Sequence, residues 1–405
     1  MTKGEAFKNS TLFLSLTTKN GYKAGKLYSI KASNGNGDFV WDRASTAYRM
    51  NQEGVLEEMV TDVPRVDYTN TCPELLIEGQ STNIIHRSQQ FDNAAWNKNN
   101  NGTGSLPIVT ANDTLAPDDT LTADKIVFNS GAGTNITDLS TINQTPSVSA
   151  GNYTGSIWLK GSVGGEQILF RHVGVSNYTL LTLTTNWVRY KLSEVQSGSN
   201  FELGIRQATN IGIINSSATI YAWGAQLEAL PYATSYIPTP ASANVTRVRD
   251  ISTNITTDFS GLKGTIFVRA RVEDSSFVKD DTILSLWGDD TDHYILIYSD
   301  KDRNIKIFTY ENPDQNDYSY ALASDGICNI AVGYDFSGVN NKLNIAINGV
   351  LKRANASQSS ASPTILNTLE LGNLIGTLPQ IDNRVIGVMW FDSQLSDSDL
   401  VNITA

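Results

Sequence analysis

The chain has 405 residues, of which 40% are hydrophobic and only 18% are charged, and its formal net charge at pH 7 is −11. This composition can fill two or three domain cores, and it excludes a disordered chain. The acidic balance without a basic stripe excludes nucleic-acid binding by phosphate neutralisation, and no apolar run is long enough for membrane insertion.

The cysteines indicate a reducing compartment. Cys72 and Cys328 are the only two, so neither a disulfide framework nor a cysteine-rich zinc site can be built. The N-terminal residues also lack the long apolar region of a signal peptide. We therefore expect synthesis in a host cytoplasm and release by lysis or by assembly into a particle.

The first 90 residues show no clear periodicity. Their apolar pieces are short and stand among polar residues: Leu12–Leu16, Val55–Leu56 and Leu75–Ile77. We expect residues 1–90 to form an irregular segment that gains order from a partner, as an attachment and assembly segment would.

Alternation of apolar and polar residues becomes strong from about residue 150. Thr154–Lys160 reads TGSIWLK, and Ala218–Leu227 reads ATIYAWGAQL. Such short runs, rich in β-branched and aromatic residues and separated by Gly, Asn and Ser, are typical of strands. They predict a jelly roll over residues 91–240, with Trp158 and Trp223 in its core.

A proline-rich stretch follows the jelly roll. Pro231–Ser242 contains three prolines, which a central strand does not accept. We interpret it as an extended linker, which continues through residues 241–263.

Residues 264–405 show a second strand rhythm, which predicts a second sandwich. Asn348-Gly349 is its strongest turn signal, because a type I′ hairpin needs positive φ at both central positions. Helix is scarce, and the best candidate is Leu395–Val401, with Ser396 as N-cap and Asp399 three residues later. The expected strands are Thr265–Val272, Thr282–Trp287, Tyr294–Tyr298, Ile305–Tyr310, Ile330–Tyr334, Leu343–Ile347, Leu369–Leu371 and Val385–Phe391.

No local motif for catalysis is present. The three histidines, His86, His172 and His293, are far apart in sequence, and no phosphate-binding loop stands between a strand and a helix. No strand carries acidic residues at alternate positions, although distant strands could still bring two carboxylates together. We expect no enzyme.

One acidic loop is a candidate cation site. Asp289, Asp290 and Asp292 follow Trp287 at a predicted strand end, and clustered carboxylates suit a hard cation such as structural calcium. The alternative is a solvated acidic turn without a metal.

Aromatic residues near polar loops are candidates for glycan contact, because flat rings stack on the apolar faces of sugars. Trp390, by contrast, is flanked by apolar residues and is expected in the core. The glycan-contact candidates are Trp287, Tyr294, Tyr310, Tyr318 and Tyr320.

A longer pattern runs through residues 39–250. It begins with RASTA at residues 43–47 and closes with WGAQLE at residues 223–228 and YATSYIPT at residues 232–239. In this order the chain resembles the phage head-spike-fibre type of domain found in tailed-phage structural proteins. The motif residues that we assign to assembly contacts are Arg43, Asn51, Gly54, Pro64, Arg65, Asp67, Tyr68, Glu78 and Asn83.

The resemblance implies an all-β protein of tandem antiparallel β-sandwiches, with a carbohydrate-binding-module-like jelly roll. Residues 251–405 resemble a concanavalin A-like or laminin-G-like sandwich. The resemblance further implies a virion subunit, of a head fibre, spike or tail fibre, that forms a homotrimer, contacts phage capsid or tail proteins and binds host-surface glycans. A tail-associated glycan depolymerase and a free carbohydrate-binding lectin are the alternatives.

Overall fold

The computed structural model shows an all-β protein, as the sequence predicts, and the strand pairs of its four large sheets are antiparallel. It describes residues 1–15, 20–23, 26–29, 39–70, 72–133, 135, 137–172, 178–196, 200–206, 215–255, 261–272, 281–288, 293–311, 314–322, 326–337, 340–359, 365–372 and 382–405.

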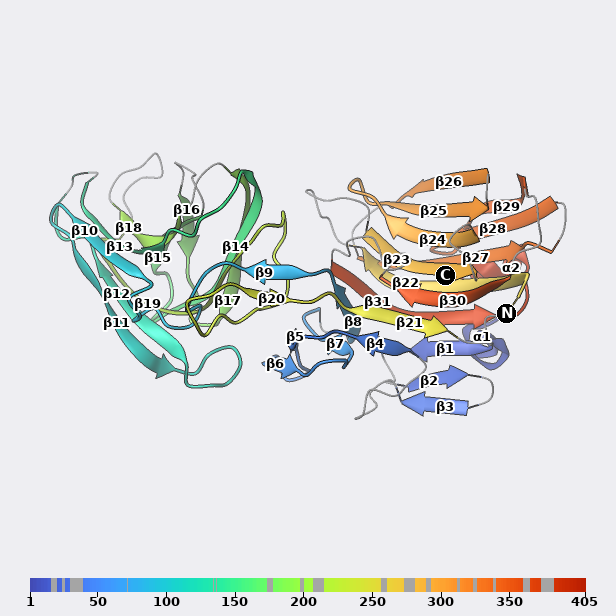
Figure 1. Cartoon of the computed structure of the whole chain (residues 1–405), viewed down its shortest axis with the longest axis horizontal. Helices are drawn as coiled ribbons and strands as arrows, with labels where there is room; N and C mark the ends of the chain where they lie inside the picture. The colour runs from blue at the N-terminus through green and yellow to red at the C-terminus, as the bar shows by residue number, and fades with distance from the viewer. Residues whose placement is uncertain are drawn as a thin grey trace. The chain divides into compact units, whose positions relative to one another are not determined.

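The chain divides into two compact units (Figure 1). The first unit contains Met1–Gly54, Met59–Gln80 and Val248–Ala405, and the second contains Val55–Glu58 and Ser81–Arg247. This division differs from the four consecutive segments suggested by the sequence, because most of the first 80 residues share a unit with the C-terminal region.

The first unit is built from a ten-stranded and a seven-stranded sheet. The larger sheet has the order β29 (Val350–Ser359), β28 (Asn340–Ile347), β27 (Gly326–Asp335), β22 (Lys263–Val272), β31 (Asp382–Phe391), β1 (Leu12–Ser15), β2 (Asn20–Lys23) and β3 (Lys26–Ser29), with β8 (Glu74–Glu78) on β31 and β7 (Arg65–Asp67) on β8. The smaller sheet has the order β26 (Asp314–Ala321), β25 (Asn304–Glu311), β24 (His293–Ser299), β23 (Asp281–Gly288), β30 (Leu366–Leu371), β21 (Ile251–Ile255) and β4 (Val40–Asp42). The short strand β5 (Ala47–Met50) also belongs to this unit.

Strands from the N-terminal region complete the first unit. In β1, Leu12 pairs with Trp390 of β31, and in β8, Leu75 pairs with Val385 of the same strand. Leu12 and Leu75 are buried in one hydrophobic cluster with β31 residues. The expectation that this region waits for a partner to become ordered is therefore wrong for these strands, which gain their order from the C-terminal part of the same chain.

Two helices lie at the chain ends, α1 (Lys3–Asn9) and α2 (Asp397–Thr404). The second confirms the predicted C-terminal helix, because the Ser396 side chain accepts a hydrogen bond from the Asp399 backbone N–H. Leu400 and Ile403 of α2 pack in a small cluster with Phe267 and Met389, on the face of the ten-stranded sheet opposite its main core.

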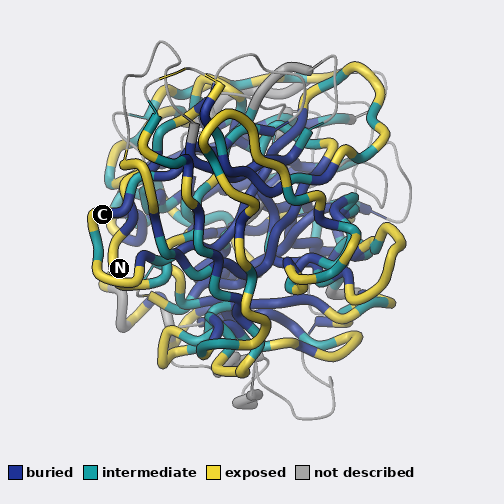
Figure 2. Tube along the Cα trace, turned by 90° about the vertical axis from the view of Figure 1, so that its left-hand side faces the viewer, coloured by how far each residue is buried: buried dark blue, intermediate teal, exposed yellow. Residues whose placement is uncertain are grey.

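The second unit holds two five-stranded sheets around a hydrophobic core. One has the order β10 (Asn97–Asn101), β13 (Leu139–Gln144), β18 (Phe201–Arg206), β15 (Gln167–His172) and β16 (Thr179–Thr182). The other has the order β11 (Ser105–Thr114), β12 (Ala123–Asn129), β19 (Ser217–Glu228), β14 (Gly151–Gly161) and β17 (Val188–Gln196), and the short strand β9 (Ser81–Asn83) pairs with β20 (Val245–Arg247). Strand β6 (Leu56–Met59) falls almost wholly in this unit. Figure 2 shows buried segments of the chain inside and mostly exposed segments around them.

The proline-rich stretch is part of the second unit and not a linker. Tyr236 and Ile237 are almost completely buried, and the Tyr236 ring lies 4.5 Å from Trp223 and 5.5 Å from Trp158, centroid to centroid. Both tryptophans are buried, which confirms their predicted core position. Gly224, with φ of +66°, allows this packing, because a Cβ there would lie 2.9 Å from the Trp158 ring.

The predicted hairpin is confirmed. Asn348 and Gly349 have φ of 48° and 75°, and Ile347 pairs with Val350 across the turn. Trp390 is also buried, as predicted.

Candidate functional site

The motif residues of the first unit form a buried ion network. Arg65 is fully buried; its Nη1 donates to Glu78 Oε2 at 2.7 Å, and its Nη2 donates to Asp250 Oδ2. Arg43 Nη1 donates to the other Asp250 oxygen at 2.9 Å. Burial alone would lower the pKa of Arg65, but the charges of Asp250 and Glu78 raise it above the ordinary value.

Asp67 belongs to a second buried pair. Its Oδ1 accepts from Arg384 Nη1 at 2.7 Å, and its Oδ2 accepts from the Met50 backbone N–H at 2.8 Å. Burial acts to raise the pKa of Asp67, but Arg384 and the Met50 hydrogen bond hold it below the ordinary value. Asp67 is thus an internal anion.

Asn83, in the second unit, is fully hydrogen-bonded. Its Nδ2 donates to the carbonyl oxygens of Ala225 and Ile237, and its Oδ1 accepts from the backbone N–H groups of Ile85 and Leu227. These contacts join segments far apart in sequence.

The remaining motif residues also make contacts or turns within the first unit. Pro64 is buried, and Tyr68 packs against the core. Asn51 accepts from the Glu53 backbone N–H, and Gly54 supplies a turn with φ of +79°. The buried members of the motif therefore contribute to the stability of their own unit, and assembly contacts at the motif stay a prediction.

The proposed calcium loop, with Asp289, Asp290 and Asp292, lies outside the described residues. Within the described ranges, no group of three or more His, Cys, Asp or Glu side chains is arranged to hold a metal ion. No helix in the described part is long and apolar enough to cross a membrane.

Three of the predicted aromatic residues form a row across the seven-stranded sheet of the first unit. Trp287 of β23 pairs directly with Tyr294 of β24, which pairs with Tyr310 of β25. Directly opposed residues of antiparallel strands share a face, so the row spans two strand spacings, about 10 Å. The Tyr294 and Tyr310 ring centroids are 5.5 Å apart. We call these three residues the aromatic row.

The aromatic row lies on the face of the sheet opposite the core. Its chain neighbours Leu286 and Ile295 are fully buried members of the core cluster, and successive strand residues alternate between faces. The row residues themselves are half-buried. Burial raises the pKa of Tyr294, and Tyr310 adds to the rise, so the Tyr294 phenol stays neutral at physiological pH.

Tyr318 and Tyr320 of β26 do not belong to this row. They pair with Ile307 and Ile305, which face the core, and both tyrosines pack against that cluster. The guanidinium of Arg353 lies 4.1 Å from the centre of the Tyr318 ring.

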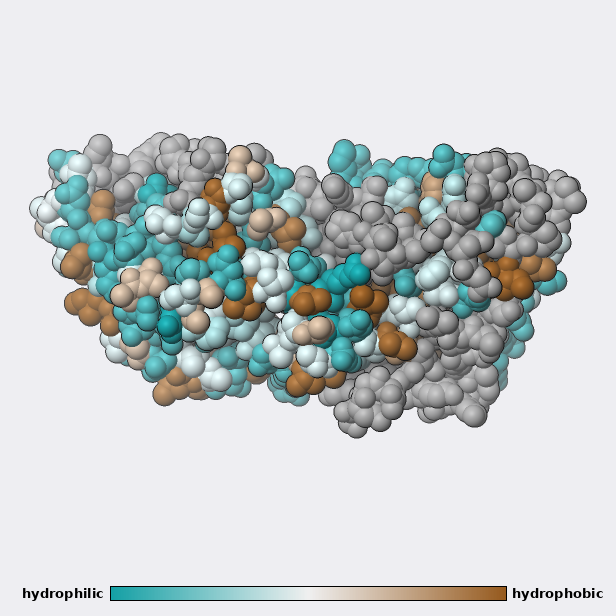
Figure 3. All heavy atoms as spheres, in the orientation of Figure 1, coloured by the Kyte–Doolittle hydropathy of each residue, from teal (hydrophilic) through white to brown (hydrophobic). Residues whose placement is uncertain are grey.

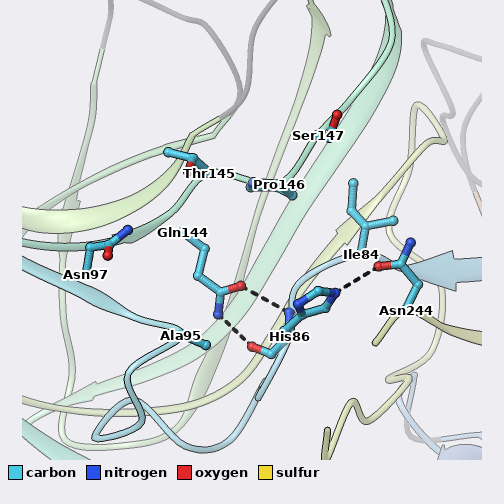
Figure 4. Close-up of a pocket in the computed structure, with 9 residues that line it drawn as sticks. All are labelled: Ile84, His86, Ala95, Asn97, Gln144, Thr145, Pro146, Ser147 and Asn244. Atoms are coloured by element: carbon cyan, nitrogen blue, oxygen red, sulfur yellow. Dashed lines mark hydrogen bonds between the residues drawn. The ribbon is translucent and has the colours of Figure 1, made fainter. Parts of the chain in front are cut away.

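A pocket of about 410 Å³ opens in the second unit (Figure 4). Alternation could not have revealed it, because its lining comes from four short, separate stretches of chain. Its polar lining residues are His86, Asn97, Gln144, Thr145, Ser147 and Asn244. Its apolar lining residues are Ile84, Ala95 and Pro146.

Reciprocal hydrogen bonds shape this pocket, as Figure 4 shows. Gln144 Nε2 donates to the His86 carbonyl at 2.6 Å, and Gln144 Oε1 accepts from the His86 backbone N–H at 3.1 Å. The His86 ring Nε2 lies 3.2 Å from Asn244 Oδ1. The His86 backbone is therefore held before any ligand arrives.

The other histidines lie elsewhere. His172 on β15 is buried in the second unit, where burial lowers the pKa of its imidazole to about 4, and the Leu192 backbone offsets only part of that effect. His293 lies on β24 of the first unit. Among the described residues, the structure thus brings no two histidines into one site.

Large exposed hydrophobic side chains of the second unit are scattered. Figure 3 shows hydrophobic residues interspersed with hydrophilic ones on the face in view. Single exposed residues of this kind are normal on folded proteins. They are Leu106, Ile108, Leu115, Leu121, Val163 and Val188.

No protein-family model and no curated protein matches the chain. Among solved structures, the chain is similar to the Ruminococcus gnavus IT-sialidase CBM40 at 15% identity and a TM-score of 0.29, over 36% of this chain and 84% of that one. It is also similar to domain 4 of AbnA, a GH43 arabinanase from Geobacillus stearothermophilus solved with arabinotriose, at 13% identity and a TM-score of 0.30, over 39% and 73% of the two chains. The botulinum neurotoxin type G receptor-binding domain gives 14% identity and a TM-score of 0.30, over 38% and 39%. TM-scores this low carry no argument about function.

Proposed function

We propose that the chain is a structural subunit of a phage particle that binds host-surface glycans without catalysing a reaction. The observation that supports glycan binding is the aromatic row, Trp287, Tyr294 and Tyr310, in register on three neighbouring strands. The row faces away from the core and its residues are half-buried, so a part of the row can contact a ligand that spans several strands.

The row suits a sugar chain for two reasons. Aromatic rings pack against the apolar C–H faces of sugars and lose little side-chain entropy on binding. Strand pairing also fixes the spacing of the rings, so a ligand does not have to order them. A row of this length offers stacking to successive sugar units, each contact being weak.

The particle role rests on the sequence resemblance to the phage head-spike-fibre type of domain, which spans residues 39–250. A particle that displays many copies strengthens weak glycan contacts through effective concentration. A closed homotrimer would give that multivalency within one fibre or spike.

The aromatic row is tested by binding of the whole purified protein to an array of bacterial surface polysaccharides. We expect Trp287→Ala and Tyr310→Ala to weaken binding at least tenfold. Trp187→Ala is the matched control, because Trp187 is a half-buried tryptophan of the second unit. Equal binding by all variants, with unchanged thermal unfolding, would remove the row from the proposal.

The particle role is tested separately. Mass spectrometry of purified virions should detect the protein at a fixed ratio to the major capsid protein, and light scattering of the isolated protein should give the mass of a trimer. Absence from purified virions contradicts the particle role while leaving glycan binding open to its own test.

A further inference from the structure

We propose that the pocket of the second unit is a separate binding site for a neutral sugar, and that its ligand is the terminal unit of a longer neutral glycan. The site shares no residue with the aromatic row and does not depend on it.

The lining of the pocket contains no Asp, Glu, Lys or Arg. Asn97, Thr145 and Ser147 are exposed, so a bound ligand stays partly in water. A charged ligand would still exchange part of its hydration for a surface without a counter-charge, which is unfavourable. The lining therefore favours an uncharged ligand.

The pocket also offers unused hydrogen-bonding groups. Sugar hydroxyls both donate and accept, and a side-chain amide offers two donor hydrogens and one acceptor oxygen. Among the described residues, the side chains of Asn97, Thr145 and Ser147 have no hydrogen-bond partner. With Asn244 Oδ1 accepting from His86, the Asn244 Nδ2 donor and the His86 Nδ1 acceptor also stay available.

Part of the pocket lining is apolar. Ile84 and Pro146 lie beside the polar groups, and Figure 4 shows Asn97 on one side of the pocket with Ile84 and Asn244 on the other. Small-ligand sites combine an apolar surface with a few placed polar groups, and about 300–1,000 Å³ is their usual volume. A single sugar ring matches this combination, with one apolar face and a rim of hydroxyls.

A row of linked asparagine side chains extends from the pocket over the neighbouring strands. Asn99 lies two residues after Asn97 on β10, so both point to the same face of the sheet. Asn99 Nδ2 donates to Asn143 Oδ1 at 2.8 Å, and Asn143 Nδ2 donates to Asn200 Oδ1 at 3.0 Å. These linked amides continue the polar surface across β10 and β13, where further sugar units would lie.

The experiment uses saturation-transfer NMR on the whole protein with five probes: glucose, galactose, mannose, N-acetylglucosamine and the acidic glucuronate. At least one neutral sugar should give a signal and shift the imidazole resonances of His86. Asn97→Ala and His86→Ala should each weaken that binding at least tenfold. His86→Ala keeps the backbone bonds to Gln144, so the pocket wall stays in place.

Two further variants make the result specific. Asn152→Ala is the matched control, because Asn152 is an exposed asparagine on β14, in the other sheet. This variant should bind the neutral sugar as tightly as the unchanged protein. Asn97→Asp adds a negative charge and keeps the shape, so it should weaken neutral-sugar binding without creating glucuronate binding. The inference is overturned by no signal from any neutral sugar, by equal binding in the alanine variants, or by glucuronate binding as tightly as the neutral sugars. Since Trp287→Ala leaves this pocket intact, failure of the aromatic row and failure of the pocket are distinguishable.

Discussion

At the scale of single residues, Arg65 shows how one residue of the motif holds distant parts of the chain together. Its guanidinium bridges Glu78 and Asp250, which lie 172 residues apart in sequence, and the Glu78 backbone N–H also donates to Asp250. All three side chains are buried. Removing the cation would leave two carboxylates buried without it.

We therefore predict that Arg65→Met lowers the free energy of unfolding by about 3–5 kcal/mol, the cost of breaking a buried ion pair from one side. Urea unfolding of the whole chain measures the change. Lys301→Ala, which removes an exposed pair with Asp302, is the control and should change it by less than about 1 kcal/mol. If Arg65→Met lowered the free energy of unfolding by less than about 1 kcal/mol, the network would not be needed for stability.

His172 makes the second unit sensitive to acid. Its imidazole lies against Gly155, where a Cβ would be 2.9 Å from the ring, and burial lowers its pKa from 6.5 to about 4. Between these two values the unfolded chain binds a proton that the folded chain does not. The contribution of the neutral ring is therefore complete above pH 6.5 and is lost as the pH falls through 4.

We expect this site alone to cost about 3 kcal/mol of stability between pH 7 and pH 4, from 1.36 kcal/mol per pKa unit. His172→Leu removes the titrating group, so its stability should fall less steeply over that range. Urea unfolding at several pH values compares the two proteins. Parallel curves would show that His172 does not titrate between the folded and unfolded states.

At the scale of elements, alternation predicted the central strands well. The strands β14, β19 and β22 pack apolar residues on a core and were expected within a few residues of their bounds. Two edge strands were not predicted, because their sequences are mostly polar: β10 reads NKNNN and β26 reads DQNDYSYA. Each lies at the end of its sheet, where backbone pairing with one neighbour suffices and fewer apolar side chains are needed.

The two candidate sites were predictable to different degrees. Aromatic residues near polar loops included Trp287, Tyr294 and Tyr310, but only the strand register shows that these three form one row. The same register puts Tyr318 and Tyr320 on the core side. The pocket was not predictable at all, because His86 and Asn244 meet through pairing of β9 with β20, two three-residue strands with no pattern of their own.

At the scale of the whole molecule, the first unit depends on both ends of the chain. Leu12 and Leu14 of β1 and Leu75 and Ile77 of β8 are almost completely buried in its core. Burying one such side chain contributes about 1.5–3 kcal/mol, so the four together contribute about 6–12 kcal/mol. A domain is stable by only about 5–15 kcal/mol in total.

We therefore predict that residues 248–405 expressed alone do not fold, although they contain every strand expected for the second sandwich. Residues 81–247 alone should fold, because their core cluster and both five-stranded sheets lie within that range. Two-dimensional amide NMR of the two fragments gives the readout: dispersed signals for residues 81–247 and collapsed signals for residues 248–405. A fragment of residues 248–405 that folds and melts cooperatively would contradict this prediction. It would mean that the sandwich is stable without strands β1 and β8.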